Sequence, residues 1–279
     1  MKFKLFDRER DKKVLKAVII AVVVIGCSIT IKDELVWQFG GESDYYDDYS
    51  YTENYLGECN VAKIDIKGFL DVEAYEEGAI SSSEIVGAIE DIQNNPDLKA
   101  IILDIDSTGG VPVAGEEISN ALSRIDKPTV ALIRGFGNSS AYWVAVGTDK
   151  IFASANSDVG SIGVTMSYLD NAQQNQITGL NYNSISSGKF KDTGDPNKTL
   201  TWEEKQYLMR DVNIINDNFI KAVAEKRNLE IAKVKKLADG SSMLGQMALE
   251  NGLIDEIGDM YAVKKYLEDL IGEEVILCD

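Results

Sequence analysis

The 279-residue sequence contains no histidine. This absence excludes catalytic triads with a histidine base and zinc sites with histidine ligands. An enzyme with this sequence would need lysine, aspartate, glutamate or tyrosine as its base, or a metal ion. Basic residues are also few: 28 lysines and arginines face 46 acidic residues, a formal charge of −18. That balance disfavours a broad nucleic-acid-binding surface, and we predict no nucleic-acid partner.

Cysteine is almost absent, and its spacing excludes further classes. The chain has Cys27, Cys59 and Cys278 and no CxxC pair, which excludes a typical structural zinc or thioredoxin-like site. Cys59 and Cys278 flank the soluble part, where they either pair in an oxidising compartment or remain free thiols. Neither GxGxxG nor GxxxxGK[ST] occurs. We therefore predict no nucleotide cofactor and no metal.

The N-terminus has the pattern of a membrane anchor. Residues 1–13 are rich in lysine and arginine, and residues 14–31 are almost entirely apolar. This length and the position of the bases predict a transmembrane helix at 14–31, with 1–13 in the cytoplasm and the rest of the chain extracytoplasmic. Two alternatives remain open: a cleaved signal peptide, and lipoprotein processing that leaves Cys27 as a lipidated N-terminus.

Residues 32–58 follow as an acidic, tyrosine-rich linker. The stretch 41–58 holds six acidic residues and five tyrosines with no base. Such a composition does not bury a core and predicts a solvated spacer.

From residue 59 to 279, short strands alternate with amphipathic helices. The predicted strands are 61–67, 100–105, 129–133, 151–153, 182–186 and 275–277, and the predicted helices are 83–94, 113–125, 139–148, 201–227, 229–237, 243–251 and 260–271. This alternation predicts an α/β domain with a mainly parallel sheet. Sites in such domains lie at the carboxyl ends of strands, where two glycine-rich turns occur, at 109–110 and 135–140.

The second of these turns carries a candidate nucleophile. Ser139 follows a strand and opens an apolar helix. A helix start favours developing negative charge, and backbone amides there can form an oxyanion hole. The competing interpretation is that Ser139 is only a helix N-cap.

A polar loop at 187–194 carries a candidate base. It contains Lys189 and Lys191. A lysine acts as a base only when it is neutral, which desolvation promotes, and a neutral lysine near a serine hydroxyl activates it as a nucleophile. The competing interpretation is an ordinary solvated loop lysine.

Several motifs in a fixed order resemble one known family. They are D-S-T-G-G at 106–110, G-N-S-S-A-Y-W at 137–143, D-K-I-F-A at 149–153, V-G-S-I-G-V at 159–164, S-G-K-F-K-D at 187–192, A-D-G at 238–240 and A-L-E-N-G-L-I-D-E-I-G at 248–258. Together they resemble signal peptide peptidase SppA, the membrane-bound Ser-Lys peptidase of bacteria. The resemblance covers about residues 61–258 and implies a fold similar to ClpP and the crotonases.

The resemblance assigns the catalytic pair. The family's serine precedes the lysine of a D-K dipeptide by eleven residues, which implies Ser139 as nucleophile. The family's base is the second lysine of its S-G-x-x-K-D motif, which implies Lys191. The serine of the G-S-I-G-V motif, which orients the lysine amine, corresponds to Ser161.

The resemblance also implies an oxyanion hole made by the turn at Gly109 and Gly110, with the amide of Ser140 as second donor. The sequence departs from the family pattern at four positions around it. Asp106 and Thr108 replace the usual asparagine and proline, and Ser140 and Ala141 replace two glycines. These changes add a charge and two Cβ atoms close to the predicted site.

The expected function is therefore a membrane-anchored serine endopeptidase with a Ser139–Lys191 dyad. Its expected substrates are hydrophobic peptides such as residual signal peptides, and short family members imply a homo-oligomeric ring with the dyad shared between neighbours. The alternative is a non-catalytic oligomeric scaffold or peptide-binding protein on the same fold. Crotonase-type acyl-CoA chemistry is a third hypothesis, and the absence of a basic phosphate-binding patch disfavours it.

Overall fold

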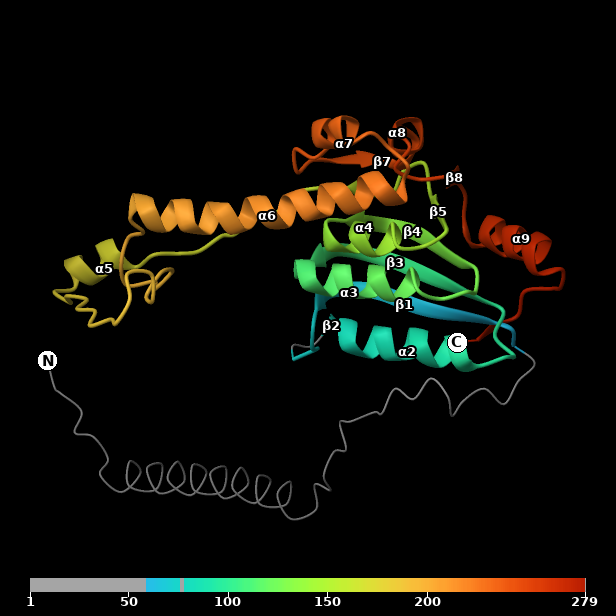
Figure 1. Cartoon of the computed structure of the whole chain (residues 1–279), viewed down its shortest axis with the longest axis horizontal. Helices are drawn as coiled ribbons and strands as arrows, with labels where there is room; N and C mark the ends of the chain where they lie inside the picture. Colours follow the sequence, from blue (N-terminus) through green and yellow to red (C-terminus); the bar gives the residue numbers. More distant parts are fainter. Residues whose placement is uncertain (1–58, 76–77, 279) are drawn as a thin grey trace, which may run out of the picture. The chain divides into compact units, whose positions relative to one another are not determined.

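The computed structural model of the chain describes residues 59–75 and 78–278 (Figure 1). The predicted anchor at 14–31, Cys27 and the acidic linker at 32–58 lie outside these residues. Within the described part, no helix combines the length and the apolar character that crossing a bilayer requires. The assignments made for the N-terminal segments stay predictions.

The described residues form strands and helices in alternation. The strands are β1 (Val61–Asp71), β2 (Ala79–Ser81), β3 (Ala100–Gly110), β4 (Thr129–Asn138), β5 (Lys150–Ala153), β6 (Asp158–Gly160), β7 (Ser242–Leu244), β8 (Glu256–Ile257) and β9 (Leu277–Cys278). The helices are α2 (Ser82–Asn94), α3 (Pro112–Leu122), α4 (Ser140–Ala145), α5 (Ala172–Ile177), α6 (Trp202–Lys226), α7 (Ile231–Leu237), α8 (Gly245–Asn251) and α9 (Met260–Ile271).

The strands build one sheet whose main order is β2-β1-β3-β4-β5-β8. β9 adds to β1, while β6 pairs with the end of β4 and with β7. All these pairs are parallel except β6–β7, which is antiparallel. The predicted α/β class with a mainly parallel sheet is confirmed.

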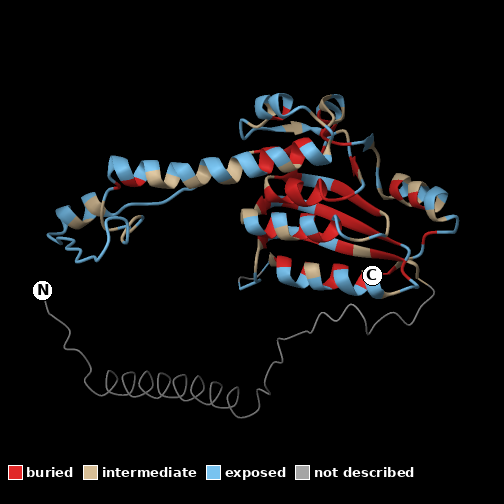
Figure 2. Ribbon diagram, viewed as in Figure 1, coloured by how far each residue is buried: buried red, intermediate tan, exposed pale blue. Residues whose placement is uncertain are grey.

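Both faces of the sheet are packed because successive side chains of a strand point to opposite sides. Ile64, Leu103 and Ile133 belong to the larger core, which includes buried residues of α2, α3 and α4. Ile102 and Leu132 belong to a second core that includes buried residues of α9. Figure 2 shows this burial concentrated in the strands and in the helix surfaces that meet them.

Residues 165–210, which we call the arm, contrast with this core. No residue between 163 and 199 is buried, and the arm is mostly exposed in Figure 2. The arm ends with the first turns of α6, and this helix begins with a capping box: the Glu204 N–H donates to Thr201 Oγ1 and the Thr201 N–H donates to the Glu204 carboxylate. The second half of α6 is docked, since Phe219 stacks on Trp143 of α4 at 4.6 Å between ring centroids.

The short elements β2, β6, β7, β8 and α5 were not predicted from the sequence, and two further features differ. The predicted strand at 182–186 is wrong: the segment lies in the arm and has no ladder partner in the described chain. β3 and β4 run further than predicted because their glycine-rich ends still pair, Gly110 with Leu70 of β1 and Gly137 with Val159 of β6. The longer strands therefore include the glycines at 109–110 and at 135 and 137, and β4 ends directly before Ser139.

A disulfide joins Cys59, which precedes β1, to Cys278 in β9. The pairing that the sequence left open is therefore present. Asn60 ties the same two segments, because its side chain donates to the Glu274 carbonyl at 2.8 Å and accepts from the Ile276 N–H at 2.9 Å. The two ends of the described domain are thus fastened to one sheet edge.

Candidate active site

The strand ends place two of the predicted serines side by side. Ser139 directly follows β4, and Ser161 directly follows β6, its parallel neighbour, with Asn138 paired to Gly160. The Ser139 N–H donates to the Gly160 carbonyl at 2.8 Å, which ties the two turns together. The arrangement follows the rule that sites in parallel sheets lie at carboxyl ends of neighbouring strands.

Both serines have an unusual backbone. Among the described residues, only Ser139 (φ 53°), Ser161 (φ 49°) and Asn228 (φ 50°) have positive φ without being glycine. Such conformations cost about 1–3 kcal/mol each and cluster at functional sites. The Ser139 side chain makes no capping hydrogen bond to α4. Ser139 therefore occupies the N-cap position of α4, as the competing interpretation has it, but its hydroxyl does not cap the helix.

The glycine turn at the end of β3 lies against this serine. A Cβ on Gly109, which has φ 101°, would come within 2.8 Å of the Ser139 Cβ and 3.0 Å of the Ser140 nitrogen. The Gly109 N–H itself donates to Ser107 Oγ at 3.0 Å. Gly109 therefore serves the site through its small size. Gly110 lines the cleft beside Ser139, and the Ser140 amide occupies the first turn of α4, where helices leave N–H groups free.

We expect Gly109→Ala to separate strain from function. The variant combines an unfavourable φ with a clash into Ser139, whereas Gly272→Ala, at φ 78°, adds a Cβ with no atom within 4 Å. Gly272→Ala should lose about 1–2 kcal/mol of stability, and Gly109→Ala should lose more because of the clash. Only Gly109→Ala should lose peptide cleavage, by about a hundredfold. Thermal unfolding and a peptide assay on both variants check this. Equal activity of the two would show that the turn does not shape the site.

The substitutions around the site are accommodated locally. Gly115 of α3 lets Ser140 fit, since a Cβ on Gly115 would lie 2.9 Å from the Ser140 Cβ. Asp106, the added charge, accepts a hydrogen bond from the Phe136 N–H of β4 at 3.0 Å. Asp106 does not line the cleft that contains Ser139. The charge that Asp106 adds therefore lies outside this cleft in the described chain.

A cleft of about 510 Å³ opens at Ser139 and Ser161. Some of its other walls lie in motifs that the sequence analysis had noted: Gly163, Val164, Ala238, Asp239 and Gly240. Sequence reasoning missed the rest, which are Pro112, Thr165, and Val212, Asn213 and Asn216 of α6. The Ser161 hydroxyl donates to the Gly240 carbonyl at 3.0 Å, which leaves its lone pairs available as acceptors. Donation from the Ser241 hydroxyl and amide lowers the pKa of Asp239, so this wall stays ionised.

Lys191 does not line this cleft. It lies exposed in the arm, where the preceding Phe190 stacks on Tyr207 of α6 at 5.1 Å. Tyr207 and Asn216 are separated by about 14 Å along α6, at about 1.5 Å per residue. The structure thus brings together Ser139, Ser161, Gly109, Gly110 and Ser140, and it holds Lys191 of the same subunit apart from them.

Comparison with known proteins finds a peptidase family and protease relatives. The model of peptidase family S49 matches residues 121–273. A proposed protease of Methanocaldococcus jannaschii is 32% identical over 255 residues, covering 90% of this chain and 79% of the relative. A proposed signal peptide peptidase, SppA, of Enterococcus faecium is 34% identical over 173 residues, covering 61% and 50%. Protease 4 of Haemophilus influenzae is 27% identical over 237 residues, covering 82% and 38%.

An α/β domain with a strained serine at the carboxyl end of a parallel strand, similar throughout to proteases, is a peptidase domain. More specifically, the chain belongs to peptidase family S49, the family of signal peptide peptidase SppA.

Proposed function

We propose that this protein is a serine endopeptidase in which Ser139 is the nucleophile and Lys191 the general base. The observation that carries the proposal is the Ser139 hydroxyl, which is free of the helix, held at a strained turn and directed to a cleft that also contains Ser161 and Gly110. A nucleophile at a fixed, strained turn is pre-organised for attack on a carbonyl.

The chemistry follows from these groups. Ser139 Oγ attacks the scissile carbonyl while its proton passes to the neutral Lys191 amine, and the tetrahedral oxyanion accepts hydrogen bonds from the amides of Gly110 and Ser140. Lys191 returns the proton to the leaving amine, and water then hydrolyses the acyl-enzyme. Ser161, whose own proton is donated to Gly240, accepts a hydrogen bond from Lys191 and fixes its direction.

The base comes from a second copy of the chain in this proposal. Lys191 is separated from Ser139 within one subunit, and it lies on an arm with large exposed apolar side chains: Leu169, Ile177, Ile185 and Trp202 are 86%, 79%, 104% and 73% exposed. Apolar patches of this kind mark contact surfaces. A homo-oligomeric ring would cover them and bring each Lys191 to a neighbouring cleft.

We further propose that residues 14–31 anchor the protein in the cell membrane, with the peptidase domain outside the cytoplasm. The Cys59–Cys278 disulfide supports this side of the membrane, because disulfides persist in oxidising compartments. The substrates are hydrophobic peptides such as residual signal peptides, as the name of the Enterococcus relative suggests.

The test is cleavage of a quenched peptide with an apolar stretch by the detergent-solubilised full chain. Ser139→Ala should lower kcat/KM at least about a thousandfold, and Ser83→Ala, an exposed serine on α2, should leave it unchanged. Wild-type activity should rise with pH through one ionisation, as a lysine base requires. Equal cleavage by wild type and Ser139→Ala would remove Ser139 as nucleophile, and no cleavage by an intact oligomer would favour a non-catalytic scaffold.

A further inference from the structure

The loop that carries Lys191 contains three lysines in different electrostatic situations. Lys189 forms an ion pair with Glu203 at 2.8 Å, and Lys198 pairs with Asp192 at 3.0 Å and with Glu204. Within the described residues, the Lys191 side chain makes no hydrogen bond or ion pair. Lys191 is followed in the chain by Asp192, whose carboxylate is already paired with Lys198.

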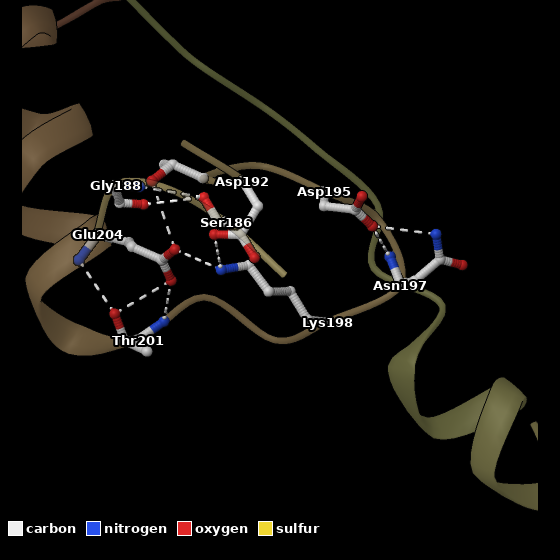
Figure 3. A network of polar contacts seen from close by, with 9 residues as sticks. Ser186, Gly188, Asp192, Asp195, Asn197, Lys198, Thr201 and Glu204 are labelled. Carbon is white, nitrogen blue, oxygen red and sulfur yellow. Dashed lines mark hydrogen bonds and ion pairs between the residues drawn. The ribbon is translucent and has the colours of Figure 1, made fainter. Parts of the chain in front are cut away.

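Figure 3 shows the polar contacts that connect Lys198 with Asp192 and Glu204. Glu204 Oε2 accepts hydrogen bonds from the Thr201 N–H at 2.8 Å and from its hydroxyl at 3.0 Å. Glu204 Oε1 accepts from Lys198 and from the Thr193 hydroxyl. The same carboxylate therefore caps α6 and binds the loop, which fixes residues 192–198 to the first turn of the helix.

The burial of the two ion-pair systems differs. The Lys198 and Asp192 side chains are each 21% exposed and Glu204 is 4% exposed, whereas Lys189 and Glu203 are 61% and 54% exposed. Exposed pairs contribute little, while partly buried, multiply bonded ones hold geometry. The Lys198 network is thus the stronger attachment, and the Lys189 pair is a natural control.

The charges of this network persist over a wide pH range. Hydrogen bonds from Lys198 hold the pKa of Asp192 and that of Glu204 below their usual ranges, and Glu204, followed by Asp192, raises the pKa of Lys198. The other titratable groups that face the loop are Lys189, Asp195, Tyr182, Glu203 and Tyr207. Of these, Asp195 accepts a hydrogen bond from Asn197, and Glu203 forms an ion pair with Lys189. Lys198 is the cation that pairs with Asp192 and Glu204.

We propose that Lys198 is a positioning residue for the base: by binding the carboxylates of Asp192 and Glu204, it fixes the loop on α6 and keeps both carboxylates from pairing with Lys191. The inference rests on the proposed function, since it explains how a lysine in an acidic loop stays available as a base. A free carboxylate beside Lys191 would stabilise its ammonium form and so withhold the proton acceptor.

The test follows Lys191 in the intact oligomer by two independent measurements. One is the pH profile of kcat/KM for peptide cleavage, and the other is the pH dependence of Lys191 acylation by acetic anhydride, quantified by mass spectrometry. Lys198→Met should move both profiles towards alkaline pH by about one unit, with kcat rather than KM affected. Lys198→Arg should restore the wild-type profiles, and Lys189→Met should leave them unchanged.

A second variant separates charge from loss of structure. Lys198→Met combined with Asp192→Asn removes the freed carboxylate that is adjacent to Lys191 in the chain, so both profiles should return towards wild type. Superimposable acylation profiles of wild type and Lys198→Met would overturn the inference, as would an equal shift in Lys189→Met. Absence of cleavage with the acylation shift intact would instead count against the proposed activity alone, because the acylation measurement requires no turnover.

Discussion

Oligomers assembled from equal amounts of Ser139→Ala and Lys191→Ala subunits should recover about a quarter of wild-type activity, although each variant alone is inactive. Each site in the proposed ring takes its serine from one subunit and its lysine from a neighbour. Random assembly then leaves about one site in four with both groups intact. The expectation follows from the geometry, because Lys191 lies on the arm and does not line the cleft that contains Ser139.

The experiment co-expresses the two variants with different affinity tags and isolates oligomers that carry both tags. The matched control pairs Ser139→Ala with the Ser139→Ala/Lys191→Ala double variant, in which no arrangement assembles a complete dyad. Recovery in the first mixture and none in the control would establish a shared site. A doubly tagged oligomer without any recovered cleavage would contradict the shared dyad and require the loop to fold back within one subunit.

Loss of the Cys59–Cys278 disulfide should have the largest effect on stability. The bridge closes a loop with a sequence separation of 219 residues, and the chain-entropy model assigns such a cross-link about 5 kcal/mol of stability. For a domain of this size, that corresponds to a fall in Tm of about 10–20 °C. The double variant Cys59→Ser/Cys278→Ser should show this fall in a thermal scan of the full-length protein.

Reducing agent supplies the matched comparison for this prediction. Wild type should lose stability when reduced, down to the value of the double variant, while the double variant should not respond. The Asn60 side chain still bridges to residues 274 and 276 in the absence of the disulfide, so the domain is expected to stay folded at low temperature. A double variant as stable as oxidised wild type would show that these hydrogen bonds alone suffice to hold β9.

Much of the fold was available from local patterns. The alternation of apolar and polar residues predicted β1, and short apolar runs predicted β3 and β4. Thr201 as N-cap, with acidic residues in the turn that follows, predicted the start of α6, because capping depends on near neighbours. The segment at 182–186 has the composition of a strand but lacks a partner in the described chain, so it does not form one. Strand formation depends on a neighbouring strand, which no local pattern reveals.

The sequence by itself determined which residues are the candidates for the chemistry: without histidine, a serine at a glycine-rich turn needs another base, and the order of the motifs pointed to Ser139, Ser161 and Lys191. Tertiary structure alone decided how they meet. Pairing of β4 with β6 joined the two serines, and the length of α6 kept Lys191 apart from them. Only the folded loop showed that Lys198 rather than Lys191 binds Asp192. The physical reason is that residue type sets what a group can do, whereas long-range packing sets its neighbours.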